Sequence, residues 1–597
     1  MQNIEELSRL AEHSGFELQT EGPYSVCVAA PAYDPADRYR AFNFRRDPSA
    51  QVIERNAARL RDSARGLEAN GLMFIYGLPA HLARYATALA DELVFRYWIS
   101  VRAVTDLKPD GLRPEHTGIL LMSKPGAEIN RIRLPHARCR YCGETLKDWG
   151  GKSHLMREDG AALSDVWMDM VVDTSDRMPP EVFERALLLA QGRKTIQLLC
   201  DDEAAPRAAI QYFDRPNLQA FDPIEWKGRQ ETNRKIPDAM LNRLHRASCL
   251  DALRAIPSET IDLAFADPPF NLTKDYNGYR DDRSDYTGWC KRWLVEYERA
   301  LKPGGALFLV NLPRWSVWLA DYLMRTGSLY LQNWIVWNSL PEPKGVLMPA
   351  HYSVLYLTKG ESASRFNYCS MEEGWQPFDE AVFPPDRPDV CRRRSCIRKR
   401  RAAGKTWRGE LTDVWYDIHR ERRATGLSIH PCRTPERLLD RIIRLATNPG
   451  DTVLDAFAGV GTSAMVARRL GRNFIAIEQN ADYLRAAERR IEEQKSIIVY
   501  PRSVPARRRI SKRKLQLELQ RLALLLERLP TRADVERHSK YDLESFDSAF
   551  ASWSVALKAA KAVVIDSEEV TGNRLQGTDP EISPLSPVTC NLSPTDS

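Results

Sequence analysis

In two stretches of the chain, an apolar run that predicts a strand is followed directly by proline or glycine residues that end the strand or turn the chain. Residues 261–266 (IDLAFA) form a largely apolar run that predicts a buried strand. Pro268 and Pro269 follow, and because proline cannot continue the hydrogen-bond ladder, the strand must end there. Asp267 and Phe270 flank these prolines. The four residues are therefore expected at the carboxyl end of a strand, where open α/β sheets bind ligands.

The second stretch, residues 451–478, reads as a strand (TVLDAF), a glycine loop (AGVGT), a helix (SAMVARRL) and a strand (NFIAI). Gly459 and Gly461 allow a tight turn and a close approach of the backbone to a ligand. Glu478 closes the second strand, where its carboxylate can accept from ribose hydroxyls. The third glycine of the dinucleotide fingerprint is missing from GVGTSA, which favours S-adenosylmethionine (SAM) over NAD. We predict an α/β fold class.

The hydrogen-bond acceptors of residues 267–270 indicate which ligand group these residues could bind. The Asp267 carboxylate and the Pro268 carbonyl both accept hydrogen bonds, and proline has no competing N–H. Together they could hold both hydrogens of an exocyclic amine and leave its lone pair free to attack. Phe270 offers a face on which an extruded base can stack. Taken alone, a strand that ends in a Pro-Pro turn explains these residues equally well.

DPPF followed far downstream by DAFAGVGT resembles the DNA amino-methyltransferases of the β arrangement, in which the catalytic motif precedes the SAM motif. Residues 430–443 (HPCRTPERLLDRII) resemble the family segment that leads into the SAM motif, with Thr434 where a lysine is usual. The resemblance covers about residues 235–495 and implies a Rossmann-like, SAM-dependent methyltransferase domain. It implies catalysis by Asp267, Pro268, Pro269 and Phe270, and cofactor binding by Asp455, Phe457, Gly459, Gly461, Thr462, Glu478, His430 and Pro435.

The resemblance also bears on the substrate. The family's cytosine enzymes of this arrangement more often begin the catalytic motif with serine, so Asp267 favours N6 of a flipped adenine in double-stranded DNA. Three alternatives stay open: methylation of cytosine N4, methylation of adenine in RNA, and DNA binding without catalysis. A cognate restriction endonuclease is a further potential partner.

Positive charge is concentrated in two segments of a chain whose net charge is +6. They are residues 392–408 and residues 507–514, and such clusters suit phosphate backbones. In the β arrangement the interval at residues 360–409 carries target recognition, so by resemblance we assign DNA contacts there, against the alternative of a solvated basic loop. The assigned residues are Arg392, Arg393, Arg394, Arg398, Lys399, Arg400 and Arg401.

An internal repeat predicts that the methyltransferase domain is duplicated. Residues 71–124 parallel 305–359, and further matches follow in the same order, at SDVWMDM with TDVWYDI and at PEVFERALLLA with PERLLDRIIRLA. In this first copy, about residues 20–225, Ala30 stands where Asp267 stands, and Asp202 and Ala204 replace the two loop glycines. We predict a degenerate, inactive first copy that forms an internal pseudo-dimer with the second, which would allow a monomeric protein. A fold similarity without a shared interface is the alternative.

Eleven cysteines are scattered along the chain. Cys139 and Cys142 form one C-x2-C pair, half of a zinc site, and the chain has no second one. Cys391 and Cys396 stand at the comparable place in the second copy. Four unligated thiols are the favoured interpretation, and a zinc site with one pair from each copy is the alternative.

The C-terminal part predicts a small DNA-binding unit. Residues 498–514 read as a basic linker, and residues 515–562 as a helical module that resembles the repeat associated with homing endonucleases. Residues 563–597 are rich in serine, proline and threonine, which predicts disorder. The polar N-terminus and the lack of a long apolar run predict a cytoplasmic protein without a membrane span.

Overall fold

The computed structural model describes most of the chain and divides it into two compact units, Met1–Ile498 and Val499–Ser597, which are described separately. The ranges described are residues 2–103, 112–147, 154, 156–172, 177–200, 235–276, 278–339, 345–367, 388–405, 411–419, 433–495, 512–526, 528–539, 541, 543–550 and 552–560.

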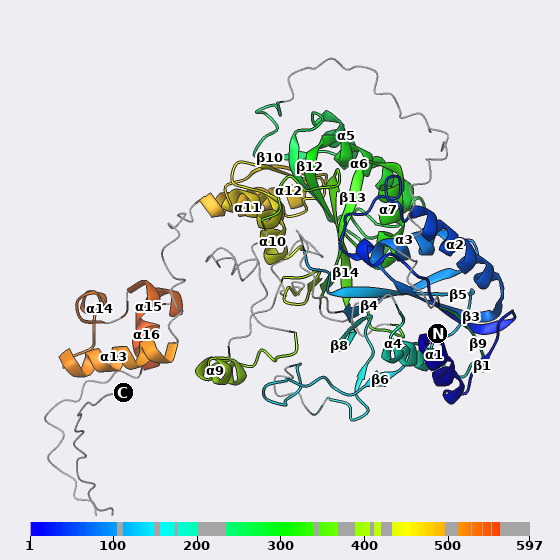
Figure 1. Ribbon diagram of the computed structural model, residues 1–597. Coiled ribbons are helices and arrows are strands. Elements are labelled where there is room, and N and C mark those ends of the chain that lie inside the picture. Colours follow the sequence, from blue (N-terminus) through cyan, green and yellow to red (C-terminus); the bar gives the residue numbers. More distant parts are fainter. Residues whose placement is uncertain are drawn as a thin grey trace, which may run out of the picture. The chain divides into compact units, whose positions relative to one another are not determined.

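The predicted catalytic motif, residues 267–270, follows a strand of an eight-stranded sheet in the first unit (Figure 1). Five neighbouring strands are parallel, the next two pairings are antiparallel, and the last is parallel. The strand end that the prolines predict and the loop that the glycines predict are both present. β11 ends at Ala266, and the glycine loop lies between β16 and α11 (Thr462–Arg469). The spatial order is β10 (Arg243–Arg246), β17 (Asn473–Glu478), β16 (Thr452–Asp455), β11 (Ile261–Ala266), β12 (Leu301–Asn311), β14 (His351–Lys359), β13 (Leu329–Asn338) and β15 (Val414–Trp415).

The N-terminal half of the same unit contains a seven-stranded sheet. From β9 to β8 its strands have the same order and the same parallel and antiparallel pairings as β16 to β15. This shared topology is what an internal duplication predicts, while descent from one ancestral domain stays a prediction. The order is β1 (Glu17–Leu18), β9 (Thr195–Cys200), β2 (Tyr24–Ala30), β3 (Leu67–Gly77), β5 (His116–Ser123), β4 (Val94–Ala103) and β8 (Val166–Val172), with a separate pair β6 (Arg133–Leu134) and β7 (Ala161–Ala162).

Helices cover both sheets, and one apolar cluster contains residues of both halves. The helices α3 and α7 pack against each other in the interface between the halves (Figure 1). Apart from α11, the helices in the described part of this unit are α1 (Gln2–His13), the 3-10 turn η1 (Pro35–Arg38), α2 (Ala50–Arg65), α3 (Pro79–Ala88), α4 (Pro180–Leu189), α5 (Cys249–Ala255), α6 (Tyr286–Ala300), α7 (Pro313–Thr326), α9 (Arg394–Ala402), α10 (Glu436–Ala446) and α12 (Ala481–Lys495).

Equivalent residues of the two halves meet across this interface. The rings of Trp98 and Trp334, which occupy matching positions in β4 and β13, stack 4.1 Å apart with an interplanar angle of 4°. Each half also receives a buried aspartate from the other. His116 Nδ1 lies 3.0 Å from Asp413, and in return His351 Nδ1 lies 3.1 Å from Asp165. The two halves therefore share a buried interface with reciprocal contacts.

Two predicted boundaries differ from the structure. The N-terminal half begins before residue 20, because Leu7 and Ala11 of α1 are fully buried and β1 pairs with β9. Its predicted SAM-loop positions, Asp202 and Ala204, lie outside the described residues. The linker ends before residue 514, its predicted end, because α13 already begins at Lys512. The rest of the linker and the C-terminal tail also lie outside the described residues.

The second unit contains four helices in its described part: α13 (Lys512–Leu526), α14 (Arg532–His538), α15 (Leu543–Ala549) and α16 (Trp553–Ala560). Apolar residues of all four, including Leu519, Val535 and Phe546, form one small core. Thr531 is the N-cap of α14, as the sequence predicts, in a capping box with Asp534. Across the described residues of both units, no helix is both long and apolar enough to cross a bilayer.

Candidate active site

The two predicted motifs lie on neighbouring strands. β11 and β16 are parallel and pair along Leu263–Phe265 and Val453–Asp455. The carboxyl ends of parallel strands meet at one edge of the sheet, so Asp267 and the glycine loop emerge side by side. A cavity of about 650 Å³ opens at this edge, within the usual size of a small-molecule pocket. Its lining includes these predicted residues: Asp267, Pro268, Pro269, Phe270, Asp455, Phe457, Gly459, Thr462 and Glu478.

Asp267 is held by a hydroxyl from a distant part of the chain. The Thr434 hydroxyl donates to its Oδ2 at 2.7 Å. Burial raises the pKa of Asp267 to about 6, and the Thr434 bond and the nearby charge of Lys274 oppose that rise. The carboxylate is thus ionised at neutral pH and available as an acceptor.

Aromatic rings form one wall of the cavity next to the catalytic motif. The rings of Phe270 and Tyr352 lie 5.6 Å apart and tilted, and Trp337 lies 5.1 Å beyond Tyr352. The indole of Trp315 donates to the Phe270 carbonyl at 2.9 Å, which fixes the backbone of the motif. The cavity therefore offers a planar, apolar surface beside the Asp267 carboxylate.

Glu478 closes the cofactor side. Its Oε2 accepts from the Gly459 amide at 2.9 Å and its Oε1 from the Asn480 amide at 2.7 Å. Burial raises the pKa of Glu478 above its ordinary value. Each oxygen has a second lone pair, so the carboxylate can still accept from a ligand's hydroxyl groups.

The glycine loop depends on left-handed backbone. Gly459 has φ 52° and Gly461 has φ 74°, a region that side chains disfavour. A Cβ on Gly461 would lie 2.6 Å from the Cβ of Ala487 in α12. This glycine therefore permits close packing of α12 against the loop.

Asp455 lies deeper, at the end of β16. It is 4% exposed, and it accepts from the Phe457 amide at 2.9 Å and from the Ser463 hydroxyl. Burial raises the pKa of Asp455 to about 7. Phe457 packs edge-on against Trp289 and Trp293, with centroids 5.8 and 5.1 Å away. Asp455 thus shapes the loop through buried hydrogen bonds.

Two described residues that the resemblance assigns to the cofactor, Gly461 and Pro435, are not among those that line the cavity. Gly461 is the N-cap of α11 and Pro435 is the N-cap of α10, so both shape helix starts. His430 lies outside the described residues. Arg433 and Thr434, the two residues before Pro435, line the cavity instead.

Several other residues that line the cavity are not predicted by the sequence. Lys274, Tyr279 and Arg283 come from the loop after the catalytic motif, which the Asp281 side chain holds by accepting from the Leu272 amide at 3.1 Å. Tyr352 is in an antiparallel strand of the sheet. No local pattern marks such residues, because sheet pairing and packing bring them to the site.

The corresponding position in the N-terminal half is filled by its own side chains. Ala30 is 3% exposed and Tyr33 is 4% exposed, and Tyr33 packs edge-on against His81 with centroids 5.7 Å apart. The Ala32 carbonyl accepts from the Asn56 amide at 3.1 Å. The N-terminal half therefore lacks a carboxylate at the position that Asp267 occupies in the second half.

The basic cluster is divided between surface and interior. On α9, residues Arg394, Arg398 and Arg401 share one helical face and are all exposed, as are Arg392 and Lys399. The predicted contact of Arg400 with DNA does not fit the structure: the side chain is 2% exposed and donates to the Cys391 carbonyl. It faces inward because it lies one turn from the buried Cys396.

With this geometry established, the comparisons identify the family. A family model described as DNA methylase matches residues 261–489, and one described as homing endonuclease associated repeat matches residues 510–561. Type II methyltransferase M1.MboII of Moraxella bovis is 30% identical over 262 residues, which cover 41% of this chain and 95% of that protein. The chain belongs to the DNA methylase family. This confirms the predicted family and the predicted C-terminal repeat.

Two further relatives are each similar to less than half of this methylase. Type II methyltransferase M.BamHI of Bacillus amyloliquefaciens is 36% identical over 244 residues, covering 40% of this chain and 54% of that protein. The methylase thus spans about half the length of that relative. M.HinfI of Haemophilus influenzae is 29% identical over 276 residues, covering 43% of this chain and 69% of that protein.

Solved structures of methyltransferases are also similar to this chain. The M1.HpyAVI–SAM complex is 19% identical to this chain, with a TM-score of 0.29. The match covers 42% of this chain and 98% of the chain in that complex. The PvuII DNA methyltransferase (cytosine-N4-specific) has 17% identity and a TM-score of 0.30, covering 44% of this chain and 87% of its own.

Proposed function

We propose that this methylase transfers a methyl group from SAM to N6 of an adenine flipped out of double-stranded DNA. One observation carries the proposal: a single cavity is lined both by the acceptor motif Asp267–Phe270 and by the glycine loop with Glu478. A base amine and a nucleoside cofactor could therefore be held next to each other. Positioning two reactants in one site supplies much of a transfer's rate.

The residues of the motif fit an amine. Asp267, ionised above about pH 6, and the Pro268 carbonyl would accept the two hydrogens of the exocyclic NH2. This arrangement leaves the nitrogen lone pair directed away from both acceptors. Phe270 and Tyr352 would stack on the base and offset part of the few kcal/mol that unstacking costs.

The residues of the loop fit SAM. Glu478 would accept from the ribose hydroxyls, and Phe457 and the backbone of Gly459 would bound the nucleoside. When bound, SAM supplies an electrophilic methyl group on a positively charged sulfur. The buried carboxylates of Asp267, Asp455 and Glu478 line the same cavity and would favour a cation there.

The charge of α9 and the family both support duplex DNA as the partner. The exposed face of α9 carries Arg394, Arg398 and Arg401, and the C-terminal unit matches a repeat associated with homing endonucleases. Membership of a DNA methylase family favours DNA over the RNA alternative. The cognate restriction endonuclease and the monomeric state stay predictions.

The deciding experiment is to sequence genomic DNA, by a method that reports modified bases, from cells that express wild type or Asp267→Ala. We expect N6-methyladenine in one short sequence motif with wild type alone. The Asp267→Ala protein must be present at the same level and bind SAM, which shows that it is folded.

The other outcomes are equally clear. N4-methylcytosine in the wild-type sample would keep the mechanism and overturn the choice of base. If neither sample carries a modified base although both proteins are folded and bind SAM, the proposed activity on DNA fails.

A further inference from the structure

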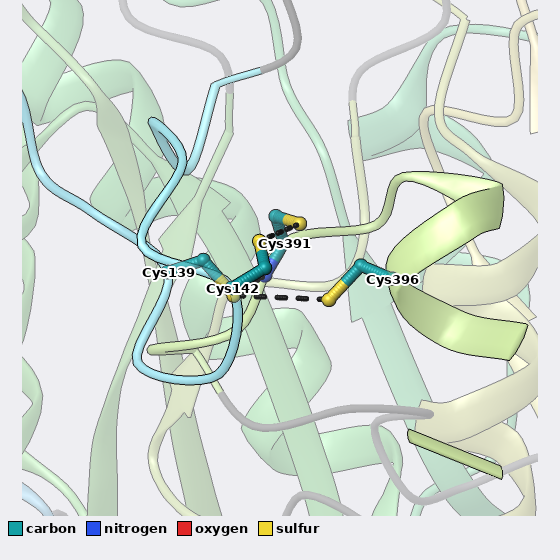
Figure 2. Close-up of side chains that lie close together, drawn as sticks. All are labelled: Cys139, Cys142, Cys391 and Cys396. Atoms are coloured by element: carbon teal, nitrogen blue, oxygen red, sulfur yellow. Dashed lines mark hydrogen bonds between the residues drawn. The ribbon is translucent and has the colours of Figure 1, made fainter. Parts of the chain in front are cut away.

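Four cysteine sulfurs of the first unit converge, and none of the four cysteines is among the described residues that line the cavity (Figure 2). Cys139 and Cys142 lie in a loop between β6 and β7, while Cys391 and Cys396 lie just before and within α9. The four Sγ atoms all lie within 4.8 Å of one another. We propose that Cys139, Cys142, Cys391 and Cys396 together bind one structural Zn²⁺ ion.

The spacing of the sulfurs fits a tetrahedral ion. With Zn–S bonds of about 2.3 Å, the sulfurs of a ZnS4 site lie about 3.8 Å apart. The Cys139–Cys396 pair is 3.9 Å apart and the Cys142–Cys391 pair is 3.6 Å apart. Disulfide sulfurs lie at about 2.05 Å, so both pairs are too far apart for that bond. All four cysteines are free thiols.

The backbone around the first pair is arranged as in a metal-binding turn. The chain reverses at Gly143, whose φ is 72° and whose amide donates to the Cys139 carbonyl at 2.8 Å. The Cys391 amide donates to Cys139 Sγ at 3.2 Å, so the second segment already contacts a sulfur of the first.

The charges nearby suit a site of this kind. A zinc ion with four thiolates carries a net charge of −2. The guanidinium of Arg400 is buried and lies beside Cys391, whose carbonyl it contacts at 3.4 Å. A guanidinium at this place would offset part of that negative charge.

A metal would also explain how so small a core is stable. The apolar cluster here consists of Cys139, Val390, Cys391 and Cys396, with two partly buried neighbours, Tyr141 and Leu146. A core of this size buries too little apolar surface to hold two segments together, and small units of this kind commonly depend on a metal. Polar contacts between the two segments include the bond from Arg393 to the Thr145 carbonyl at 2.5 Å and the bond from the Arg140 amide to the Asp389 carbonyl at 2.9 Å.

The ion would join the two halves of the unit. One ligand pair belongs to the N-terminal half and the other belongs to the segment between the catalytic motif and the glycine loop. Cys396 and Arg400 form the inner face of α9, and Arg394, Arg398 and Arg401 form its outer face. Zinc would thereby fix the basic face of α9 relative to the N-terminal half. With four protein ligands, the coordination sphere is closed to water, so the role is structural.

The test is metal analysis of the full chain, produced with zinc in the medium and purified without chelator. We expect about one zinc per chain in wild type and loss of at least four-fifths of it in Cys142→Ser and in Cys396→Ser. Cys200→Ser, a partly buried cysteine in β9, is the matched control and should keep the full amount. X-ray absorption of the wild type should show four sulfurs at about 2.3 Å.

A second measurement protects the test against variants that do not fold. Removing zinc from wild type with a chelator should increase hydrogen exchange in residues 139–146 and 391–402 and leave exchange in α10 unchanged. Wild type without zinc, iron in its place, two disulfides between these cysteines, or zinc retained by both ligand variants would each overturn the proposal. No readout involves methylation, so the zinc site and the proposed activity fail independently.

Discussion

The Thr434 hydroxyl donates to the Asp267 carboxylate at 2.7 Å, across 167 positions of sequence. Thr434 carries no charge, so the Asp267 carboxylate accepts here from a neutral donor. A neutral donor lowers the pKa of a carboxylate less than a cation would. Burial therefore dominates, and the pKa of Asp267 stays raised, at about 6.

The first prediction concerns the acid limb of the pH profile. Thr434→Val removes a hydrogen bond to the ionised form of Asp267, which should raise the pKa of Asp267 further. A bond worth about 1 kcal/mol corresponds to roughly half a unit to one unit. In kcat/KM against pH, the loss of activity on acidification should begin at a higher pH. Thr434→Ser keeps the hydroxyl and should follow wild type; identical profiles for all three proteins would contradict the assignment.

The second prediction concerns stability and pH at Asp455. Burial raises its pKa to about 7 in the folded state, from an ordinary value of 3.8. Folding therefore favours the protonated form, and the stability that this provides is complete below about pH 4 and lost as the pH rises through 7. Asp455→Asn should raise the free energy of unfolding at pH 8 by about 1–3 kcal/mol and leave it unchanged near pH 4. Urea unfolding at both pH values measures this.

The control for Asp455 is Asp238→Asn, since the Asp238 side chain is 86% exposed. Its effect should stay close to zero at both pH values. An Asp455→Asn protein that is less stable than wild type at pH 8 would show that the hydrogen bonds to the carboxylate outweigh its burial.

The third prediction concerns the glycine loop. Gly461→Ala adds left-handed strain and a contact of 2.6 Å with Ala487, and should cost about 2–4 kcal/mol of unfolding free energy. Gly450→Ala has similar left-handed backbone, φ 93°, but its Cβ would meet nothing within 4 Å. It should cost about 1–2 kcal/mol from strain alone. Equal losses in denaturant unfolding would mean that packing against α12 contributes nothing.

The fourth prediction concerns the interface between the halves. Asp165 pairs with His351 and accepts from the Ala350 amide at 2.8 Å, and Asp413 pairs with His116 and accepts from the Glu115 amide at 2.7 Å. Replacing either aspartate with alanine leaves buried donors without these acceptors and should cost about 2–4 kcal/mol.

Asp169→Ala is the control for this interface, since Asp169 forms an ion pair with Arg185 and is 41% exposed. Its loss should cost less than about 1 kcal/mol. Thermal unfolding of the three variants compares them directly. Losses of the same size in all three would show that the reciprocal pairs do not hold the halves together.

The fifth prediction concerns DNA affinity. Arg398→Ala removes one charge from the exposed face of α9. Binding to duplex DNA should weaken irrespective of sequence, and the slope of log affinity against log salt should fall by about 0.9, as for one lost phosphate contact. Arg55→Ala, an exposed residue of α2, is the control and should change neither quantity. An unchanged salt slope for Arg398→Ala would remove α9 from the DNA interface.

The sequence by itself determined the parts of this methylase that local chemistry dictates. Proline ends β11 after Ala266, and glycine is needed where φ is positive, so Asp267 and Gly459 could be assigned without any contact from elsewhere. Parallel pairing of adjacent strands then accounts for their meeting at one edge. The matching order of the two sheets also agrees with the repeat seen in the sequence.

Only the tertiary structure decided contacts between distant segments. Thr434 meets Asp267, and the sulfurs of Cys139 and Cys396 come within 3.9 Å of each other across 257 positions. The same packing turns Arg400 inward while Arg398 stays exposed, although both belong to one basic run. Residue type and spacing along the chain determine turns and strand ends, whereas these contacts depend on how sheets and helices pack, which no local pattern specifies.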